Sequence, residues 1–185
     1  MALVWIDCEM TGLDPDKDSI IEIFCLVTNG QLDFLDKSGW GTVVHQPKER
    51  MDSMDDWCIS VHGTSGLTAA AIESTVTPEQ AADELLSYIQ RLVPDKGVAL
   101  LAGNSVHADR AFLRKAPYNK VLEHLHYRIL DVSSLKEAAR RWWYHDSPEI
   151  ASGVPAKKGL HQAKQDIIES IEEARYYRST LFQPH

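Results

Sequence analysis

The sequence predicts an α/β fold in which helices cover both faces of a mixed sheet. Three segments with the composition of strands come first and form an antiparallel meander over about 47 residues. Helices and strands then alternate to the end of the chain, which is typical of α/β domains. The chain has 185 residues, close to the size of one domain, so we expect a single domain over residues 1–185.

Five segments have the apolar, partly β-branched composition of strands. They cover residues 2–8, 19–28, 31–45, 98–102 and 128–131. Asn29-Gly30 separates the second segment from the third, and this dipeptide favours a hairpin. The fourth segment is apolar without alternation, which indicates a strand covered on both faces.

Four segments have the apolar spacing of helices. They cover residues 78–93, 108–115, 133–143 and 162–181. The first of them has a defined start, because Thr77 suits the N-cap, Pro78 suits the first helical position and Gln80 completes a capping box. Residues 145–159 are rich in Pro, Gly and Ser and are expected to form a loop.

Composition excludes several classes of protein. The net charge is −8, whereas a non-specific binder of long nucleic acid needs a broad basic surface, so no long duplex partner is expected. Cys8, Cys25 and Cys58 fit neither a disulfide framework nor a zinc cluster. They favour a reducing intracellular compartment, cytoplasmic or mitochondrial. No apolar run approaches the ~20 residues of a membrane span, so no membrane partner is expected.

Asp7 and Glu9 stand at the end of the first predicted strand. Because side chains alternate along a strand, the two carboxylates share a face. Carboxylates held a few ångströms apart repel each other unless a cation lies between them, and their hard oxygens suit Mg²⁺ or Mn²⁺. The alternative is a strand end that runs into solvent, and this pair by itself does not exclude it.

Two further clusters contain acids. Asp109 falls in the first turn of a helix that follows a buried strand, at the sheet edge where α/β proteins bind ligands. A plain helix-start acid, stabilised by the helix dipole, is the alternative. His161 and Asp166 share a side only if His161 sits at or before the first turn of the last helix. A histidine there could take a proton near neutral pH, although a solvated helix start would have the same sequence.

Longer strings around these residues carry a family resemblance. Residues 5–14 (WIDCEMTGLD), 101–109 (LAGNSVHAD) and 126–134 (HYRILDVSS) resemble, in this order, the oligoribonuclease family. That family is in the His-containing branch of the DEDD 3′→5′ exonucleases, and the resemblance covers about residues 3–182. It implies a ribonuclease H-like, proofreading-exonuclease-like fold with a mixed five-stranded sheet flanked by helices.

The resemblance implies a metal-dependent hydrolase. By it, Asp7, Glu9, Asp109 and Asp166 hold two divalent cations, Mg²⁺ or Mn²⁺, and His161 is the general base. Two such cations stabilise negative charge on the attacking and leaving oxygens of a phosphodiester. The implied reaction shortens RNA from its 3′ end and releases 5′-mononucleotides.

The substrate that the resemblance implies is very short single-stranded RNA, chiefly dinucleotides. Leu13 matches an apolar wedge between two bases, and Trp57 and His62 match stacking and phosphate-side contacts. Stacking of a base on an aromatic ring contributes roughly 1–3 kcal/mol, a large share of the binding free energy for a two-base ligand.

The same resemblance implies a closed 5′ end and a dimer. Ser105, Arg128, Ser133 and Ser134 match a cap over the 5′-terminal phosphate, which would shut out longer chains. Tyr127 matches a residue that reaches the site of the partner subunit, so a homodimer is implied.

The local charge agrees with a small phosphorylated ligand. Residues 110–141 carry eight Lys or Arg against three acids in an otherwise acidic chain. Lys164-Gln165 stand where the family often carries Leu-Asp, which leaves the choice of metal open. Two other functions also stay open: an exonuclease that trims the 3′ ends of longer RNA, and a catalytically silent nucleotide-binding module. The presence of all five predicted catalytic residues argues against the silent module.

Overall fold

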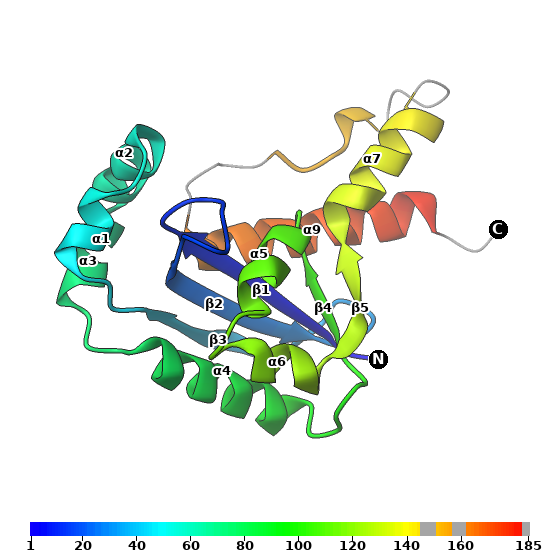
Figure 1. Cartoon of the computed structure of the whole chain (residues 1–185). Helices are drawn as coiled ribbons and strands as arrows, with labels where there is room; N and C mark the ends of the chain where they lie inside the picture. Colours follow the sequence, from blue (N-terminus) through cyan, green and yellow to red (C-terminus); the bar gives the residue numbers. More distant parts are fainter. Residues whose placement is uncertain (145–150, 157–161, 183–185) are drawn as a thin grey trace.

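A computed structural model describes residues 1–144, 151–156 and 162–182 of the chain. Its centre is a five-stranded sheet in the order β3-β2-β1-β4-β5 (Figure 1). The strands are β1 (Leu3–Met10), β2 (Ile20–Thr28), β3 (Phe34–Val43), β4 (Leu100–Gly103) and β5 (His126–Asp131). The first three are antiparallel, whereas β4 runs parallel to both β1 and β5. The expected mixed five-stranded sheet is therefore confirmed.

The hairpin between β2 and β3 is built around Asn29. Its backbone N–H donates to Asp33 O at 2.9 Å, and its side-chain Oδ1 accepts the backbone N–H groups of Gln31 and Asp33 at 2.8 and 3.0 Å. The residue with a positive φ is Leu32, at 68°, and Leu32 is also buried. The predicted hairpin is confirmed, with a loop held by the asparagine side chain.

The structure contains the four predicted helices and several short ones. The helices are α1 (Lys48–Asp52), α2 (Asp56–Ser65), α3 (Leu67–Glu73), α4 (Pro78–Leu92), α5 (His107–Leu113), α6 (Asn119–His124), α7 (Val132–Trp142) and α9 (Ala163–Leu181). Thr77 caps α4 as predicted, because its hydroxyl accepts the Gln80 N–H at 3.2 Å. The prediction of a loop over residues 145–159 is wrong at residues 151–152, which are helical. Residues 145–150 and 157–159 lie outside the described part of the chain.

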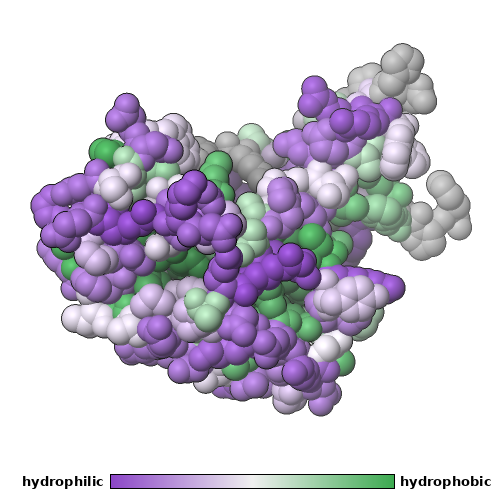
Figure 2. Space-filling model, viewed as in Figure 1, coloured by the Kyte–Doolittle hydropathy of each residue, from purple (hydrophilic) through white to green (hydrophobic). Residues whose placement is uncertain are grey.

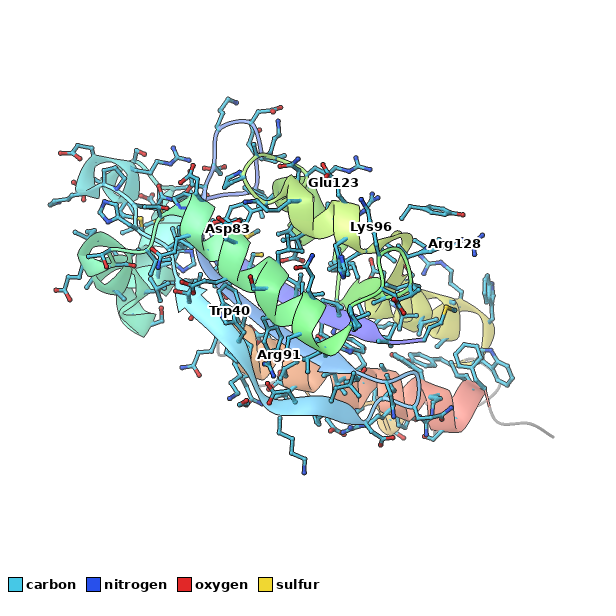
Figure 3. All side chains as sticks on the ribbon, turned by 90° about the horizontal axis from the view of Figure 1, so that it is seen from below. Trp40, Asp83, Arg91, Lys96, Glu123 and Arg128 are labelled. Carbon is cyan, nitrogen blue, oxygen red and sulfur yellow. The ribbon has the colours of Figure 1, made fainter. Side chains whose placement is uncertain are left out.

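Helices cover both faces of the sheet, as the sequence predicts. The core between the sheet and helices α4, α5 and α6 is formed by residues such as Ile6, Leu85 and Phe112. The core on the other face packs α7 and α9 against the sheet through residues such as Trp5 and Ile171. Figure 3 views the molecule from below, with α4 crossing the sheet and α6 beside it.

Helices α1, α2 and α3 form an arm at one end of the sheet (Figure 1). The arm has its own small core, in which Met51, Met54, Cys58 and Leu67 pack with Ile21 of β2. In Figure 2 hydrophilic residues dominate the visible face, and hydrophobic ones show mainly between them. Within the described residues, none of the helices combines the length and the apolarity that crossing a bilayer requires.

Candidate active site

Strand β1 presents two acids toward α9. Its odd-numbered residues face that helix, so Trp5 is buried in the core beneath α9 and Asp7 and Glu9 continue the same face toward the strand end. The pairing of β1 with β4 ends at Trp5 and Ala102, two residues before Asp7. Asp7 and Glu9 therefore lie on the part of β1 that extends beyond its pairing with the parallel strand β4.

Asp109 accepts a hydrogen bond from the part of β1 that no longer pairs with β4. The backbone N–H of Cys8, between the two acids, donates to Asp109 Oδ1 at 3.0 Å. Asp109 lies in the first turn of α5, as predicted, and its exposed fraction is 6%. A buried N–H group and a buried carboxylate thus satisfy each other, which fixes Asp109 beside the two acids of β1.

Asp166 completes the group from α9. The helix begins at Ala163, so Asp166 lies in its first turn. Asp7, Glu9 and Asp166 each offer a carboxylate oxygen, and these oxygens lie within 4.8 Å of one another. We call these three residues and Asp109 the carboxylate cluster. The proposed base, His161, lies outside the described residues.

Three of the four acids in the cluster have raised pKa values. Burial, followed by the charges of Asp109 and Glu9, raises the pKa of Asp7 well above its usual value. Burial and the neighbouring charges of Glu22 and Asp166 raise the pKa of Glu9 to about 8. Burial raises the pKa of Asp109 to about 7, although the hydrogen bond from Cys8 opposes the shift. A cation would relieve this repulsion and release the protons.

Glu22 is a fifth acid that the sequence analysis did not single out. It lies on β2 directly opposite Glu9, and its carboxylate accepts the backbone N–H of Ala163, the first residue of α9. The preceding residue, Gln162, makes no side-chain cap bond, so Glu22 acts as the cap of this helix. The available signal was an acid inside the otherwise apolar segment SIIEIFCLVT.

A cavity of about 410 Å³ adjoins the cluster. Its lining includes Glu9, Leu13, Trp57 and His62. Leu13 and Trp57 are 84% and 58% exposed, so both present apolar surface to the cavity that a ligand could cover. His62 differs from them, because it is buried and its Nε2 lies 3.0 Å from Met10 O.

Trp57 is positioned by the start of α2. Asp55 is the N-cap of this helix, and its side chain accepts the Cys58 N–H at 2.7 Å. This cap places Trp57 in the first turn, while Cys58 is buried in the arm core. The predicted stacking residue therefore stands on a fixed helix start rather than on a loop.

A second polar group forms where β4 and β5 end. The backbone N–H of Ser105 donates to Asp131 Oδ1 at 3.0 Å and to Ser133 Oγ at 2.9 Å. The two serine hydroxyls are 3.1 Å apart, and Asp131 caps α7 by accepting the Ser133 N–H at 2.9 Å. We call Ser105, Ser133 and Asp131 the serine corner. The next residue, Ser134, is exposed in the first turn of α7.

Tyr127 and Arg128 lie on β5, the edge strand of the sheet. The Tyr127 side chain is 70% exposed. The Arg128 guanidinium lies over the Tyr127 ring, 5.3 Å from its centroid. Of the residues predicted at the 5′ end of the substrate, Ser105 and Ser133 therefore contact each other directly. Tyr127 and Arg128 lie on the exposed edge strand β5, which ends at the serine corner.

The fold and the cluster together define the class of this protein as an exonuclease. The family model described as RNase_T, an exonuclease, matches residues 4–174. Among solved structures, the zinc-bound form of the E. coli ExoI–ssDNA complex aligns with a TM-score of 0.69 and 12% identity. An E. coli Exonuclease I complex with a 5cy-dT13 oligonucleotide aligns with a TM-score of 0.63 and 16% identity. The alignments cover 98% and 97% of this chain but 41% of each ExoI chain, so they show the fold.

Proteins with higher sequence identity to this chain show which family of exonucleases it belongs to. The mitochondrial oligoribonuclease of Mus musculus is 49% identical over 98% of this chain and 73% of its own length. The mitochondrial oligoribonuclease of Saccharomyces cerevisiae is 48% identical over 98% of this chain and 68% of its own. The oligoribonuclease of Vibrio campbellii is 45% identical over 98% of this chain and 96% of its own. The chain belongs to the oligoribonuclease family.

Proposed function

We propose that this chain is a 3′→5′ exoribonuclease that degrades very short RNA, chiefly dinucleotides, to 5′-mononucleotides. The observation that carries the proposal is that Glu9 belongs both to the carboxylate cluster and to the lining of the cavity beside Leu13 and Trp57. A group that can hold cations and a surface that can hold bases therefore meet at one residue. The similarity of this chain to oligoribonucleases supports the same reaction.

The carboxylate cluster fits divalent cations. Four acids converge there, three with oxygens within 4.8 Å of one another and the fourth bonded to the intervening backbone. Hard carboxylate oxygens are the ligands that Mg²⁺ and Mn²⁺ prefer. Asp7, Glu9, Asp109 and Asp166 would hold two such ions. When bound, the ions supply an activated water and stabilise charge on the phosphodiester oxygens.

The cavity supports binding of two bases. Leu13 and Trp57 both line the cavity and are exposed, and they are proposed to separate neighbouring bases and to stack on a base, respectively. Stacking contributes roughly 1–3 kcal/mol per base, which matters most when only two bases bind. His62 is proposed on the phosphate side of the cavity, where its bond to Met10 O fixes the ring.

The serine corner supports a preference for short substrates. Ser105 and Ser133, with Ser134 and Arg128, are proposed to bind the 5′-terminal phosphate of the dinucleotide. The first turn of α7 adds N–H groups and a favourable dipole for an anion. A phosphate held there would leave no path for further nucleotides on the 5′ side.

Proton transfer is assigned to His161. An imidazole is suited to remove a proton from water near neutral pH. Its place in the sequence, two residues before the first residue of the helix that carries Asp166, supports this role.

A homodimer is also proposed. The edge strand β5 carries the exposed Tyr127, which is proposed to reach the site of the partner subunit. Light scattering should give about twice the 20.8 kDa mass of the chain, and a monomer mass would contradict the proposal. A reducing compartment, cytoplasmic or mitochondrial, is proposed from the three buried free cysteines and from the mitochondrial and bacterial relatives.

The length profile of cleavage tests the function. With Mn²⁺, the rate should be highest for the 5′-phosphorylated dinucleotide pApA and should collapse as the RNA lengthens toward a ten-mer. EDTA and Asp7→Ala should both abolish cleavage. Equal rates for the dinucleotide and the ten-mer would favour an enzyme that trims longer RNA. Binding of pApA without cleavage under any metal condition would favour a silent binding module.

A further inference from the structure

The loop that carries Leu13 has little apolar support. It spans residues 11–19 between β1 and β2, and we call it the Leu13 loop. Leu13 itself is 84% exposed, so it does not anchor the loop in a core. The position of the proposed base wedge therefore depends on polar contacts made elsewhere in the loop.

Two of the contacts within the loop converge on the carboxylate of Asp18. Its Oδ1 accepts from the Thr11 hydroxyl at 3.0 Å, and its Oδ2 accepts from the Asp14 N–H at 2.9 Å. The backbone at Gly12 packs directly against the Asp18 carboxylate, because a Cβ added at Gly12 would lie 2.4 Å from Asp18 Oδ2. Asp18 therefore determines the shape of the loop.

Arg50 ties this centre to the arm. Its Nη2 donates to Thr11 Oγ1 at 2.8 Å, to Asp18 Oδ1 at 2.7 Å, and to the carbonyl oxygen of Lys17. The side chains of Arg50 and Asp18 are only 28% and 17% exposed. Charge-assisted hydrogen bonds shielded from water in this way are stronger than surface ion pairs.

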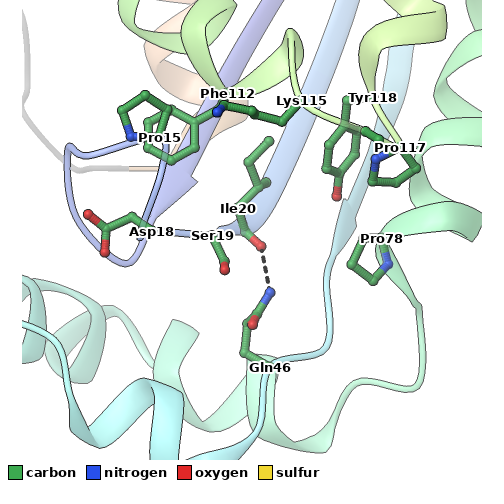
Figure 4. A pocket seen from close by; sticks show the side chains of 11 residues that line it. Pro15, Asp18, Ser19, Ile20, Gln46, Pro78, Phe112, Lys115, Pro117 and Tyr118 are labelled. Carbon is green, nitrogen blue, oxygen red and sulfur yellow. Dashed lines mark hydrogen bonds between the residues drawn. The ribbon is translucent and has the colours of Figure 1, made fainter.

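On the opposite side of the loop, the described residues make no buried ion pair of this kind. A cavity of about 140 Å³ lies there, bounded by Pro15 and Asp18 of the loop and by Phe112 and Tyr118 from the segment around α5 and α6 (Figure 4). Among the described contacts on that side, an ion pair joins Lys115 to Asp16, with side chains 51% and 75% exposed. Such an exposed pair contributes little, so Arg50 is the main external anchor of the loop.

Arg50 also belongs to the arm that carries Trp57. It lies in α1, and the next residue, Met51, is buried in the arm core with Cys58 of α2. One side chain thus links the Leu13 loop to the helices that carry the opposite wall of the base cavity.

We propose that Arg50 is a positioning residue that fixes the Leu13 loop against α1 and thereby sets the spacing between Leu13 and Trp57. This inference rests on the proposed function, because it assumes that a dinucleotide binds between those two side chains. Arg50 touches neither the carboxylate cluster nor the serine corner in the described contacts. Its loss should therefore affect substrate binding and leave the chemical step unchanged.

Steady-state cleavage of pApA tests this role. Arg50→Ala should raise KM roughly tenfold, as expected for a lost charge-assisted bond, and should leave kcat within about twofold of the parent. Arg50→Lys keeps the charge but not the position of Nη2, from which all the described contacts are made, so its KM should fall between those of the parent and Arg50→Ala. Lys48→Ala is the matched control, because Lys48 is in the same helix but pairs with Asp52 on the surface.

A double substitution shows whether Arg50 acts through the loop. In a Leu13→Ala background the wedge is already absent, so adding Arg50→Ala should raise KM by less than about twofold. An unchanged KM in Arg50→Ala, or an equal rise in both backgrounds, would overturn the proposal. If Arg50→Ala is unfolded at the assay temperature, Asp18→Asn replaces it and should raise KM in the same way.

The failure of the proposed function gives a different result. If the parent protein itself neither binds nor cleaves pApA, the dinucleotide assignment is wrong and the inference about Arg50 is wrong with it. If the parent cleaves pApA and Arg50→Ala behaves like Lys48→Ala, the function stands and only the inference is wrong.

Discussion

Replacing Glu9 by glutamine is expected to stabilise the metal-free protein although it removes a proposed metal ligand. Burial and the charges of Glu22 and Asp166 raise the pKa of Glu9 from 4.5 to about 8. The folded state therefore holds this proton more tightly than the unfolded state, and the free energy of unfolding falls as the pH rises from 4.5 to about 8. Glutamine resembles the protonated acid and does not ionise, so the free energy of unfolding of Glu9→Gln should not fall for this reason as the pH rises.

The magnitude follows from the width of that window. At pH 7 the solution is about 2.5 pH units above the unfolded-state pKa, and each unit corresponds to 1.36 kcal/mol, so the difference is about 3 kcal/mol. For a chain of 185 residues this corresponds to a rise in Tm of about 6–12 °C. The difference should shrink to less than about 1 kcal/mol at pH 5, because the parent then carries the proton at little cost.

The assay is thermal unfolding in EDTA, followed by circular dichroism at several pH values from 5 to 8. Addition of Mn²⁺ should then raise the Tm of the parent more than that of Glu9→Gln. Glu49→Gln removes an exposed acid from α1 and serves as the control, with an expected change within about 0.5 kcal/mol. A Tm of Glu9→Gln at or below that of the parent at pH 7 in EDTA would refute the electrostatic account of the cluster.

Three other substitutions test separate parts of the site. Glu22→Gln keeps an acceptor for the Ala163 N–H, so it should retain more pApA cleavage and slower hydrogen exchange at the start of α9 than Glu22→Ala. Met51→Ala removes a side chain that is 1% exposed in the arm core and should cost about 2–5 kcal/mol in urea unfolding; a smaller loss would show that the arm is not packed. Arg128→Ala should weaken calorimetric binding of 5′-phosphorylated dinucleotides more than of 5′-hydroxyl ones, and equal losses would remove Arg128 from the cap.

The elements that could be predicted from the sequence are those with a strong local pattern. Strand β1 is a short apolar run buried on both faces, helices α4 and α9 each bury an apolar face, and the cap at Thr77 marks the start of α4. Helix α2 was not predicted, because its apolar residues are not gathered on one face and its packing comes from the arm core. Local patterns do not show helices that depend on such distant contacts.

The same distinction applies to the site. The shared face of Asp7 and Glu9 follows from strand alternation, and the place of Asp166 near the start of the last helix follows from the predicted helix over residues 162–181. The role of Glu22 requires knowing that β2 pairs with β1 in one register. The role of Arg50 depends on a contact between residues 32 positions apart in the chain, which no local rule supplies.

The bond between Asp109 and the Cys8 backbone also affects which ion the site favours. One oxygen of that carboxylate is already occupied by an N–H donor, so it has one oxygen left to offer without competition. Chelation by both oxygens is then disfavoured at this corner. Large ions such as Ca²⁺ readily accept two oxygens from one carboxylate, whereas Mg²⁺ demands single oxygens in octahedral order. If the carboxylate cluster binds divalent cations as proposed, Asp109 would therefore offer its ion a single oxygen, which suits Mg²⁺ better than Ca²⁺.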